Sequence, residues 1–539
     1  MASNGSGSPF ARRLLLAYGL LNALLYSSLL PLWEGFDEPF HFDYVQSLAE
    51  GHGFPDPRSS PLQGEVSASL LLAPGSVRVK ENLPEIRTYP EYFQLPRTRR
   101  LAIRNQLRSL HGQNEGARIL SYEGLQAPLA YLLLAVPEWV LTGLPLPDRV
   151  LVLRILGAFC GTLLLYFGAD RLFEELRLAE PWKNAAIFCI FSTQMLWATL
   201  AHVANDWLAV PLSVWLLVAV IRYWRRPGMK AAVCFGCLLA LGLLTKAYFL
   251  ALAPLAAVLA LRKRPLREAA AALVIVLAAA GPWYVRNLLH YGSLGGTQES
   301  RVGVGVMAVI ANAGKLNWPA VIVASVRSSL WTGNNSFTAF SGRTEAVLIA
   351  AWAIALLLYI RGKHTTAESI ASIFCALFMA ALGYGAVAAF VITRGSALGP
   401  SPWYAQILLV PMLGLAMLGC ARAATLGKTA AIVLVSLFAY MLAATYLFKL
   451  IPYYAGYTGR TSWHGLIAAY SDIGNLNEIA LAPAWMLLTL ALAVSAIAFA
   501  QAILLLHATL IVDGGRPLDP AIGGTHGAHA PPRGNAASS

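Results

Sequence analysis

The chain has 539 residues, of which 57% are hydrophobic and only 12% are charged, and its mean hydropathy is +0.59. Soluble domains carry roughly 25% charged residues, so this composition excludes an ordinary water-soluble protein and predicts several membrane spans. The net charge is +13, but the basic residues gather in short stretches between apolar runs, as orientation in a membrane requires. Nucleic acid is therefore not an expected partner.

The first apolar run follows a basic start. Residues 1–13 end in Arg12 and Arg13, and the run at 14–32 comes directly after them. A cleaved signal peptide has a shorter apolar core and a cleavage site of small residues. We therefore expect 14–32 to be an uncleaved first span and 1–13 to be a cytoplasmic N-terminus.

Further apolar runs recur along the chain, most of them near the roughly 20 residues that a helix needs to cross the hydrocarbon. Including the first, they lie at 14–32, 150–168, 184–202, 207–222, 231–245, 247–261, 268–286, 344–361, 368–392, 402–421, 427–449 and 482–507. They predict an all-α integral membrane protein with about twelve or thirteen transmembrane helices, the thirteenth candidate being the apolar stretch at 126–142. All six cysteines lie in such runs, so neither a disulfide framework nor a cysteine metal site is predicted.

Whether residues 126–142 cross the membrane decides which way the later spans run. If they do not cross, four later basic clusters fall on the same side as the basic start. These clusters lie at 222–230, 262–267, 361–363 and 422–428. The positive-inside rule makes that side cytoplasmic. We therefore predict that 126–142 is a re-entrant or interfacial helix and that the long first loop, 33–125, faces outside.

This orientation divides the chain into segments. Residues 14–295 are predicted to form a membrane module that includes the outer loop 33–125. A second outer loop follows at 296–343, then the C-terminal transmembrane helices at 344–508, and then a low-complexity tail at 509–539 that is predicted to be disordered. Long loops on the outer side place the work of the protein at that face.

An acidic pair follows the first span, in the stretch FDEPFHFDY at 36–44. Asp37 and Glu38 are adjacent, and His41 lies one helical turn after Asp37 on the same helix face. Asp37 is placed to cap a helix with Pro39 in its first turn, but capping needs only one acid. The alternative is a half-desolvated carboxylate whose raised pKa suits general-base work, with His41 orienting it or binding substrate. An interfacial histidine without such a role is equally consistent.

Four further groups of polar residues fall at span ends on the same outer face. They are Glu123 with Gln126, Asn205 with Asp206, Thr245 with Lys246, and Arg286 with Asn287. Taken singly, several have a structural explanation: Lys246 can snorkel to the interface, Arg286 can anchor its span, and Asp206 can cap the next helix. A charge at mid-bilayer costs about 2.5–3.5 kcal/mol, and intramembrane ionisable groups are functional candidates by default. Acids and bases gathered on one face favour a shared site.

Carboxylates combined with a lysine and an arginine suit one kind of chemistry at an outer membrane face. The cations can hold a phosphate presented by a lipid, and a carboxylate can deprotonate a hydroxyl that attacks the carbon bonded to that phosphate. The cations then stabilise the departing phosphate. The arrangement predicts glycosyl transfer from a polyprenyl-phosphate sugar to an acceptor hydroxyl.

The motifs resemble those of the GT-C glycosyltransferases. They are the acid pair, QAPL at 126–129, ND at 205–206, GLLTK at 242–246 and WYVRN followed by YG at 283–292, with a fainter match in SPWYAQILLVP at 401–411. They are similar to motifs of bacterial proteins related to protein O-mannosyltransferases and to the lipid A aminoarabinose transferase. Apart from the fainter match, the resemblance covers residues 31 to about 295, which implies that the membrane module 14–295 is catalytic.

The resemblance implies a GT-C-type multi-span fold whose first outer loop bears juxtamembrane helices, a polyprenyl- or dolichyl-phosphate sugar donor, and an inverting mechanism without a covalent intermediate. Asp37 matches the acidic base, with Glu38 as its catalytic neighbour. Lys246 and Arg286 match basic positions that face the lipid phosphate, and Asp206 matches a second acid near the pocket. The remaining candidates for binding substrate or lipid phosphate are His41, Glu123, Gln126, Asn205 and Asn287.

The chain also departs from the family pattern. Gln126 and Ala127 stand where relatives often have His-Pro before Pro-Leu, which leaves the role of that helix open, and the Trp-Trp-Asp motif of oligosaccharyltransferases is absent. Asp37, His41 and Asp43 are too few to assign a metal site. No cofactor is therefore predicted, and a divalent cation stays open without an assigned ligand set.

The expected partners are a polyprenyl-phosphate sugar donor, membrane lipids, and a lipid, glycan or protein acceptor. The expected location is the plasma membrane, the inner membrane of a bacterium, with the site facing the periplasm or exterior. Arginines in the first outer loop are either solvated or dock anionic groups; they are Arg97, Arg99, Arg100, Arg104 and Arg108.

Two other functions are compatible with this topology. A transporter or flippase without chemistry is the main alternative, although transporters usually hold polar groups near the midplane between inverted repeats, and no repeat is visible. A non-catalytic, lipid-binding scaffold fits the topology but not the pairing of acids with bases.

Overall fold

The computed structural model describes residues 9–75, 87–111, 119–255, 266–295, 303–329, 340–395, 402–455 and 484–514. Within these ranges the chain forms helices joined by turns, with one isolated bridge between Pro61 and Leu120 and no strand. The all-α prediction is confirmed for these residues. Most of the predicted basic cluster at 262–267 lies outside the described ranges.

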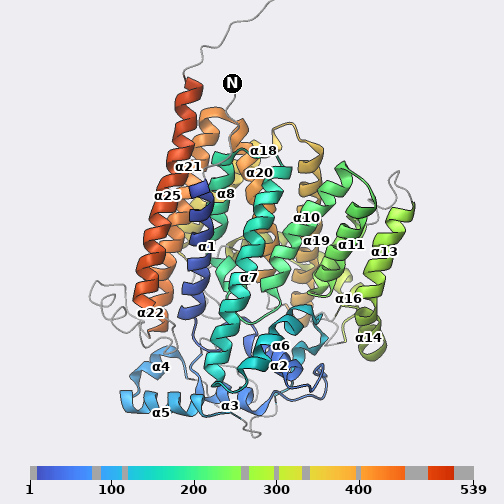
Figure 1. Ribbon diagram of the computed structural model, residues 1–539, viewed down its shortest axis with the longest axis vertical. Coiled ribbons are helices and arrows are strands. Elements are labelled where there is room, and N and C mark those ends of the chain that lie inside the picture. Colours follow the sequence, from blue (N-terminus) through green and yellow to red (C-terminus); the bar gives the residue numbers. More distant parts are fainter. Residues whose placement is uncertain are drawn as a thin grey trace, which may run out of the picture.

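Helix α1 (Pro9–Leu29) leads into a segment of short helices. They are α2 (Glu38–Ala49), α3 (Gly64–Leu72), α4 (Tyr89–Gln94), α5 (Arg97–Arg108), the 3₁₀ helix η1 (Tyr122–Leu125) and α6 (Leu129–Leu141). Figure 1 shows these helices gathered at one end of a helix bundle, opposite the end that carries the N-terminus. We call this the lower end, after its place in Figure 1, and we call residues 33–125 the outer segment. The helices expected in the first outer loop are therefore present.

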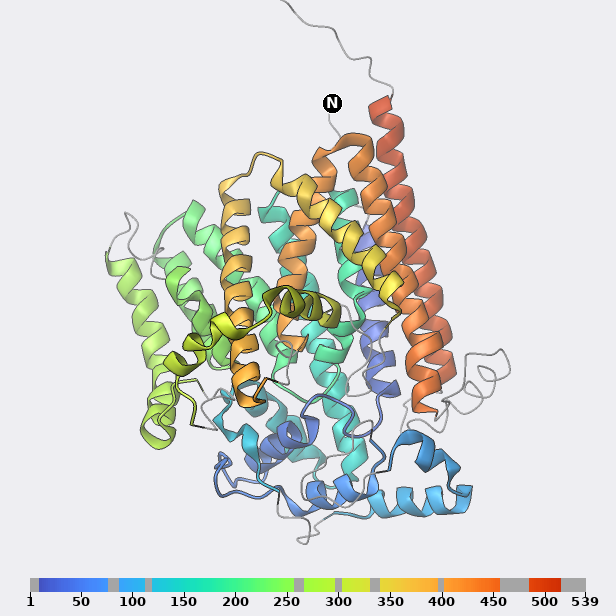
Figure 2. The same cartoon turned by 180° about the vertical axis from the view of Figure 1, so that it is seen from behind.

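The remaining elements build the bundle. They are α7 (Leu146–Glu175), α8 (Glu180–Phe191), α9 (Gln194–Leu200), α10 (Asp206–Arg225), α11 (Met229–Leu243), η2 (Ala247–Leu252), α13 (Leu266–Ala279), α14 (Gly281–Tyr291), α16 (Val306–Ala311), η3 (Ala313–Lys315), α17 (Trp318–Ser329), α18 (Gly342–Ile360), α19 (Thr366–Ile392), η4 (Pro402–Leu408), α20 (Leu409–Arg422), α21 (Ala424–Ala444), the π-helix η5 (Thr445–Leu450), α22 (Ile451–Tyr454) and α25 (Ala484–Gly514). Helix α1 packs against both α25 and α7, so the first and last helices lie side by side (Figures 1 and 2). One continuous apolar core extends from Leu15 to Leu506.

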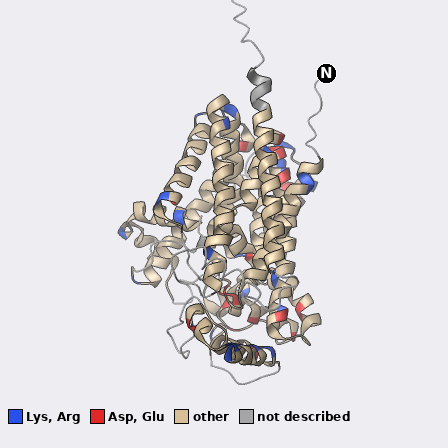
Figure 3. Cartoon of the chain, turned by 90° about the vertical axis from the view of Figure 1, so that its left-hand side faces the viewer, with Lys and Arg blue, Asp and Glu red and all other residues tan. Residues whose placement is uncertain are grey.

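Several of these helices can cross a membrane. Among the described residues, seven helices are long and apolar enough, or up to nine if each of two bent pairs is one span. Charged residues gather near both ends of the bundle, and the helix walls between them carry few (Figure 3). The chain is thus an α-helical membrane protein. The number of twelve or thirteen crossings stays a prediction, because α11 is short for a full span and residues 256–265 of the expected run 247–261 lie outside the described ranges.

Some expected segments have a different form. The run 184–202 is divided into α8 and α9, and the run 268–286 is bent by 49° between α13 and α14, where Gly281 and then Pro282, which has no amide hydrogen, begin the second helix. The expected outer loop 296–343 contains α16 and α17, whose axes differ by 106° across η3. Helix α25 continues to Gly514, into the tail predicted to be disordered, and residues 515–539 lie outside the described ranges.

Helix α6 corresponds to the ambiguous stretch 126–142. It has 13 residues, which is about 20 Å, so it is shorter than the roughly 30 Å of the hydrocarbon core. One face is buried and includes Glu138, whereas Val136, Trp139 and Val140 on the other side are 67–71% exposed. An exposed apolar face with a tryptophan is typical of a helix lying in the membrane interface. That 126–142 is a re-entrant or interfacial helix stays a prediction, with which the length and the exposed face of α6 are compatible.

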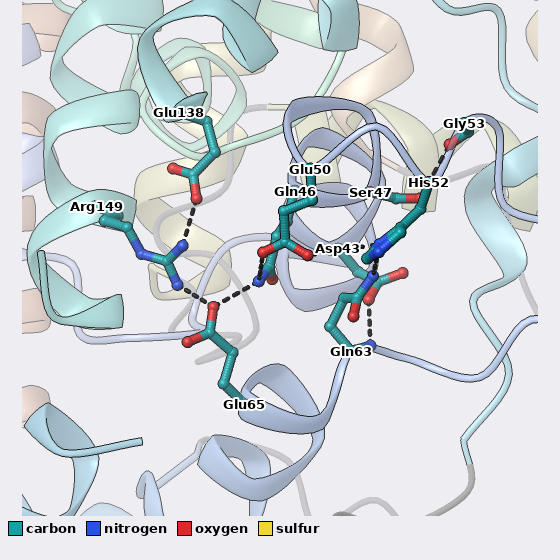
Figure 4. Close-up of polar contacts among 10 residues, drawn as sticks. All are labelled: Asp43, Gln46, Ser47, Glu50, His52, Gly53, Gln63, Glu65, Glu138 and Arg149. Carbon is teal, nitrogen blue, oxygen red and sulfur yellow. Dashed lines mark hydrogen bonds and ion pairs between the residues drawn. The ribbon is translucent and has the colours of Figure 1, made fainter. Parts of the chain in front are cut away.

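A buried polar network joins the outer segment to the start of α7 (Figure 4). Arg149 in α7 pairs with Glu65 from α3 and, at 2.6 Å, with Glu138 from α6. Gln46 in α2 donates hydrogen bonds to Glu65 at 2.6 Å and to Glu50 at 2.8 Å. Because breaking a buried ion pair is strongly unfavourable, this network holds α2, α3 and α6 in one position against α7.

Candidate active site

The loop between α1 and α2 carries the first predicted site residue, and we call residues 31–37 the Asp37 loop. Two of its non-glycine residues, Trp33 at φ 68° and Asp37 at φ 53°, adopt the left-handed conformation. Such conformations cost on the order of 1–3 kcal/mol and persist where the surroundings over-determine them, often at functional sites. The contacts of the loop show what holds it.

Arg154 in α7 fastens the Asp37 loop. Its guanidinium donates to the carbonyl of Leu30 at 2.5 Å and to that of Pro31 at 2.9 Å, and it forms a bidentate pair with Glu38, with Nε 2.6 Å from Oε1. Glu38 is fully buried and also accepts from the amide of Val203 at 3.0 Å. Burial alone would raise the pKa of Glu38, but the attraction of Arg154 outweighs it and lowers the pKa. The predicted catalytic residue Glu38 therefore lies inside an ion pair.

Contacts from α3 and from His202 also reach the Asp37 loop. The indole Nε1 of Trp33 donates to the hydroxyl of Ser69 in α3 at 2.9 Å. Gly35 has no room for a side chain, because a Cβ at this position would lie 2.5 Å from the Cβ of His202. His202 is buried, and its ring nitrogens find no hydrogen-bond partner among the described residues.

Asp37 itself is half-buried. It immediately precedes α2, but its side chain makes no capping hydrogen bond to that helix, so the capping interpretation is wrong. Its Oδ1 instead accepts a hydrogen bond from the hydroxyl of Tyr122 at 2.5 Å, and the Tyr122 ring packs against Phe40 with centroids 4.1 Å apart. The carboxylate is therefore oriented by a tyrosine of η1 while remaining partly open to its surroundings.

His41 lies one turn further along α2. Its Nδ1 shares a hydrogen bond with the hydroxyl of Tyr131 in α6 at 2.8 Å and lies 3.9 Å from Oε2 of Glu123 in η1. Burial, together with the charges of His202 and Lys246, holds the pKa of His41 well below its usual range. The imidazole is therefore neutral at pH 7, and its contact with Glu123 is not an ion pair there.

The predicted amide side chains bridge segments that are distant in sequence. Asn205 donates to the carbonyl of Thr245 at 3.2 Å and to Oε1 of Gln126 at 3.4 Å. Asn287 donates to the carbonyl of Leu125 at 3.2 Å. These bonds join the starts of α10 and η2, the end of η1 and helix α14.

Asp206 and Lys246 form a buried ion pair, with Nζ 2.6 Å from Oδ1. The ammonium group also lies 4.8 Å from the ring centroid of Tyr404 and 5.6 Å from that of Tyr248. Because Lys246 is buried, the snorkelling interpretation is wrong. The capping interpretation of Asp206 is wrong as well, because Asp206 begins α10 and the residue before it occupies the capping position.

Arg286 lies among aromatic rings in α14. It is half-buried, and its guanidinium carbon lies 4.8 Å from the ring centroid of Trp283 and 5.5 Å from those of Phe54 and Tyr291. Arg58 from the outer segment lies over the same Tyr291 ring, at 5.1 Å. Within the described part of the chain, neither arginine has a carboxylate at ion-pair distance. This corner therefore carries positive charge that no described acid neutralises.

Helix η1 joins the predicted residues into one group. Tyr122 at its start contacts Asp37, and Glu123 lies beside His41. At its end, the carbonyl of Leu125 accepts a hydrogen bond from Asn287, the residue next to Arg286. All ten predicted site residues therefore belong to a connected set of contacts. Contacting residues that the sequence did not indicate include Arg58, Tyr122, Tyr131, Arg154 and His202, whereas Tyr404 lies in the fainter motif at 401–411.

The described residues offer no ligand set for a metal ion. No group of three or more His, Cys, Asp or Glu side chains among them is arranged to hold one. Asp43, the third member of the set weighed with Asp37 and His41, instead accepts the amide of Gln63 at 2.6 Å. A divalent cation thus remains unassigned.

Comparison with known proteins yields structural neighbours. No protein-family model matches the chain, and no curated protein matches its sequence. Two crystal structures of ArnT from Cupriavidus metallidurans, one bound to undecaprenyl phosphate and one in the apo state, are similar at 12% and 13% identity, each with a TM-score of 0.45 over 92% of this chain and 77% of ArnT. ArnT is a lipid A aminoarabinose transferase of the GT-C type, the kind of protein that the sequence motifs resemble. At this identity and TM-score, the likeness by itself assigns neither a family nor an activity to the chain.

Proposed function

We propose that this protein transfers a sugar from a polyprenyl-phosphate donor to an acceptor hydroxyl at the outer membrane face, with inversion and without a covalent intermediate. The observation that carries the proposal is the state of Asp37. It is a partly exposed carboxylate in a strained loop, oriented by Tyr122, in the same connected group as Arg286. The neighbouring acid, Glu38, already forms the ion pair with Arg154 that holds the loop. Asp37 is therefore not needed for that contact and can take part in chemistry.

Asp37 acts as the general base in this proposal. It accepts the proton of the acceptor hydroxyl while the hydroxyl oxygen forms a bond to the anomeric carbon. The bond between that carbon and the phosphate oxygen breaks, and its electron pair leaves with the polyprenyl phosphate. The hydrogen bond from Tyr122 fixes the direction of the carboxylate during this transfer.

Arg286 is the group that we assign to the donor phosphate. It is half-buried and has no described carboxylate partner, and Arg58 over the same Tyr291 ring adds a second positive charge. Positive charge that is already in place stabilises the charge that develops on the departing phosphate. Lys246 is already neutralised by Asp206, so it reaches a phosphate only if that pair opens.

Three other predicted residues, Glu38, His41 and Glu123, receive supporting roles. Glu38 positions the Asp37 loop through Arg154, in place of the catalytic role that the motif implies. Neutral His41 and Glu123 are assigned to hydroxyl groups of the substrate, because they lie next to the Tyr122 that orients Asp37. The lower end then faces the periplasm or exterior of a plasma membrane, where an acceptor can reach it.

A reconstituted donor assay tests the proposal. Proteoliposomes are supplied with a panel of radiolabelled polyprenyl-phosphate sugars, and the wild type is compared with Asp37→Asn and with Asp56→Asn. We expect Asp37→Asn to lower turnover by about 10²–10⁴-fold, the usual contribution of a general base. The melting temperature of Asp37→Asn should not change, because the amide oxygen still accepts from Tyr122.

The control residue, Asp56, is a half-buried aspartate of the same outer segment, and Asp56→Asn should keep the wild-type rate. Full activity of Asp37→Asn would contradict the assignment of Asp37 as the general base.

One observation favours lipid translocation as a second candidate function. The pairs α13–α14 and α16–α17 are bent by 49° and 106°, and transporters often build their sites from interrupted helices. The same proteoliposomes can report the movement of a labelled polyprenyl phosphate between leaflets. Movement without turnover of any donor would favour the flippase.

A further inference from the structure

Trp403 is distant from Asp37 in the sequence but lies against its loop. It belongs to η4, which begins the span Trp403–Arg422 in the C-terminal half of the chain. Its ring stacks on that of Phe36, with centroids 4.3 Å apart and an interplanar angle of 27°. Phe36 is the residue immediately before Asp37. We propose that Trp403 is a positioning residue that fixes Asp37 through Phe36, an inference that rests on the proposed role of Asp37 as the base.

The Phe36 ring contacts a second aromatic ring besides Trp403. His202 meets it edge-on, with centroids 6.1 Å apart and an angle of 84°. Phe36 is only 3% exposed, so its ring has little freedom between these neighbours. One peptide unit separates Phe36 from Asp37, and a left-handed aspartate needs outside restraint to keep its conformation. Trp403 therefore supplies part of the restraint that directs the carboxylate.

The element that carries Trp403 also contacts the ion pair of Asp206 with Lys246. The next residue, Tyr404, lies over the ammonium group of Lys246 at 4.8 Å, and the Trp403 and Tyr404 rings meet edge-on at 5.6 Å. Helix η4 thus contacts both the Asp37 loop and the buried Lys246. We infer that the functional unit extends beyond the predicted module 14–295 and includes η4 at the start of the last quarter of the chain.

The first test separates positioning from direct contact with substrate. Trp403→Ala is compared with Trp403→Phe and with Trp352→Ala, a matched truncation of a half-buried tryptophan in α18 that packs on Phe438. We expect Trp403→Ala to lower kcat roughly 2- to 13-fold, the factor that corresponds to one aromatic pair, while the donor KM stays within about twofold. Trp403→Phe should restore most of the rate, and Trp352→Ala should not reduce it.

A double mutant sharpens this test. If Trp403 acts only through Asp37, then Trp403→Ala should cause no further loss in an Asp37→Asn background. Losses that multiply would mean that the half-exposed Trp403 ring contacts the substrate itself, and would overturn the positioning role. The same conclusion would follow if Trp403→Ala raised the donor KM and left kcat unchanged.

Hydrogen–deuterium exchange tests the position of the loop without any turnover. We expect peptides that cover residues 31–42 to exchange faster in Trp403→Ala by a similar factor, and to exchange at the wild-type rate in Trp352→Ala. Unchanged exchange at 31–42 in Trp403→Ala would refute the proposal even if the enzyme transfers sugar. Faster exchange in a protein that turns over no donor would support the contact while the proposed function fails.

Discussion

Replacing Arg154 by methionine should release the Asp37 loop and helix α2 from the bundle. Methionine keeps much of the length and the apolar stem but removes the four hydrogen bonds to Glu38, Leu30 and Pro31. Glu38 would then remain fully buried, with the amide of Val203 as its nearest strong donor at 3.0 Å. The carboxylate has no route to solvent unless α2 moves away from α7.

The expected cost follows from this geometry. Removing one partner of a buried ion pair costs about 3–5 kcal/mol, because the remaining charge is left uncompensated in a medium of low polarity. This energy corresponds to roughly a 160- to 5,000-fold change in the equilibrium between the docked and undocked segment. The local unfolding of α2 should therefore become more frequent by roughly two to four orders of magnitude.

Deuterium exchange of peptides from α2 measures this equilibrium directly. The matched control is Arg108→Met, which removes a partly exposed pair with Asp148 at 2.8 Å and should change exchange only a few-fold. The double variant Arg154→Met with Glu38→Met should regain much of the protection, because an apolar pair leaves no buried charge. It should not regain transferase activity, because the loop carbonyls still lack their donor.

Protection of α2 that stays at the wild-type level in Arg154→Met would refute this reasoning. It would mean that the Arg149 network alone holds the outer segment, or that Glu38 takes up a proton at little cost. Measurement at two pH values separates these outcomes, since a protonated Glu38 would make the variant less stable as the pH rises.

Three further predictions concern the site and its support. Arg286→Gln should weaken binding of undecaprenyl phosphate in nanodiscs by about tenfold, which corresponds to the loss of one charge-assisted contact of roughly 1.5 kcal/mol. Arg99→Gln on the exposed helix α5 should leave binding unchanged. Equal losses in the two variants would point to non-specific attraction. Gly35→Ala should reduce transfer more than donor binding, because its Cβ would lie 2.5 Å from that of His202; full transfer activity would show that the loop can shift. Burial outweighs the attraction of Arg149 and raises the pKa of Glu138 from its ordinary 4.5 to about 7, so the charged form carries a net cost that is absent below about pH 4.5 and grows as the pH rises through 7. Glu138→Gln should flatten the fall in melting temperature between pH 5 and pH 8, and an unchanged fall would assign it to other groups.

The sequence predicted much of the membrane architecture because apolar runs report burial in lipid directly. It also predicted that acids and bases would meet at one face, since polar residues recurred at the ends of those runs. The contacts of Asp37 could not be read from the same pattern. Tyr122 follows the acid by 85 positions, and nothing in a linear sequence marks a tyrosine that will donate to it.

The two buried arginines of α7 are site-supporting residues that the sequence could have indicated. Arg149 and Arg154 stand at the start of an otherwise apolar run, and a charge in such a run is usually paired and functional. Their spacing of five residues places them on different faces of the helix, so they reach different acids, Glu65 with Glu138 and Glu38. The identity of those acids depends on the path of the outer segment, which hydropathy does not encode.

The length of α7 has a consequence for how the protein meets its membrane. Its 30 residues extend about 45 Å, so about 15 Å, or three turns, exceed the hydrocarbon thickness. Figure 1 shows its lower end among α2, α3 and α6, where both arginines anchor the outer segment. The length of α7 therefore sets how far the Asp37 loop lies from the opposite end of the bundle, and one residue added to the helix would shift the loop by about 1.5 Å and rotate it by about 100°. If Asp37 is the base that we propose, its distance from a donor held in the membrane would depend on bilayer thickness.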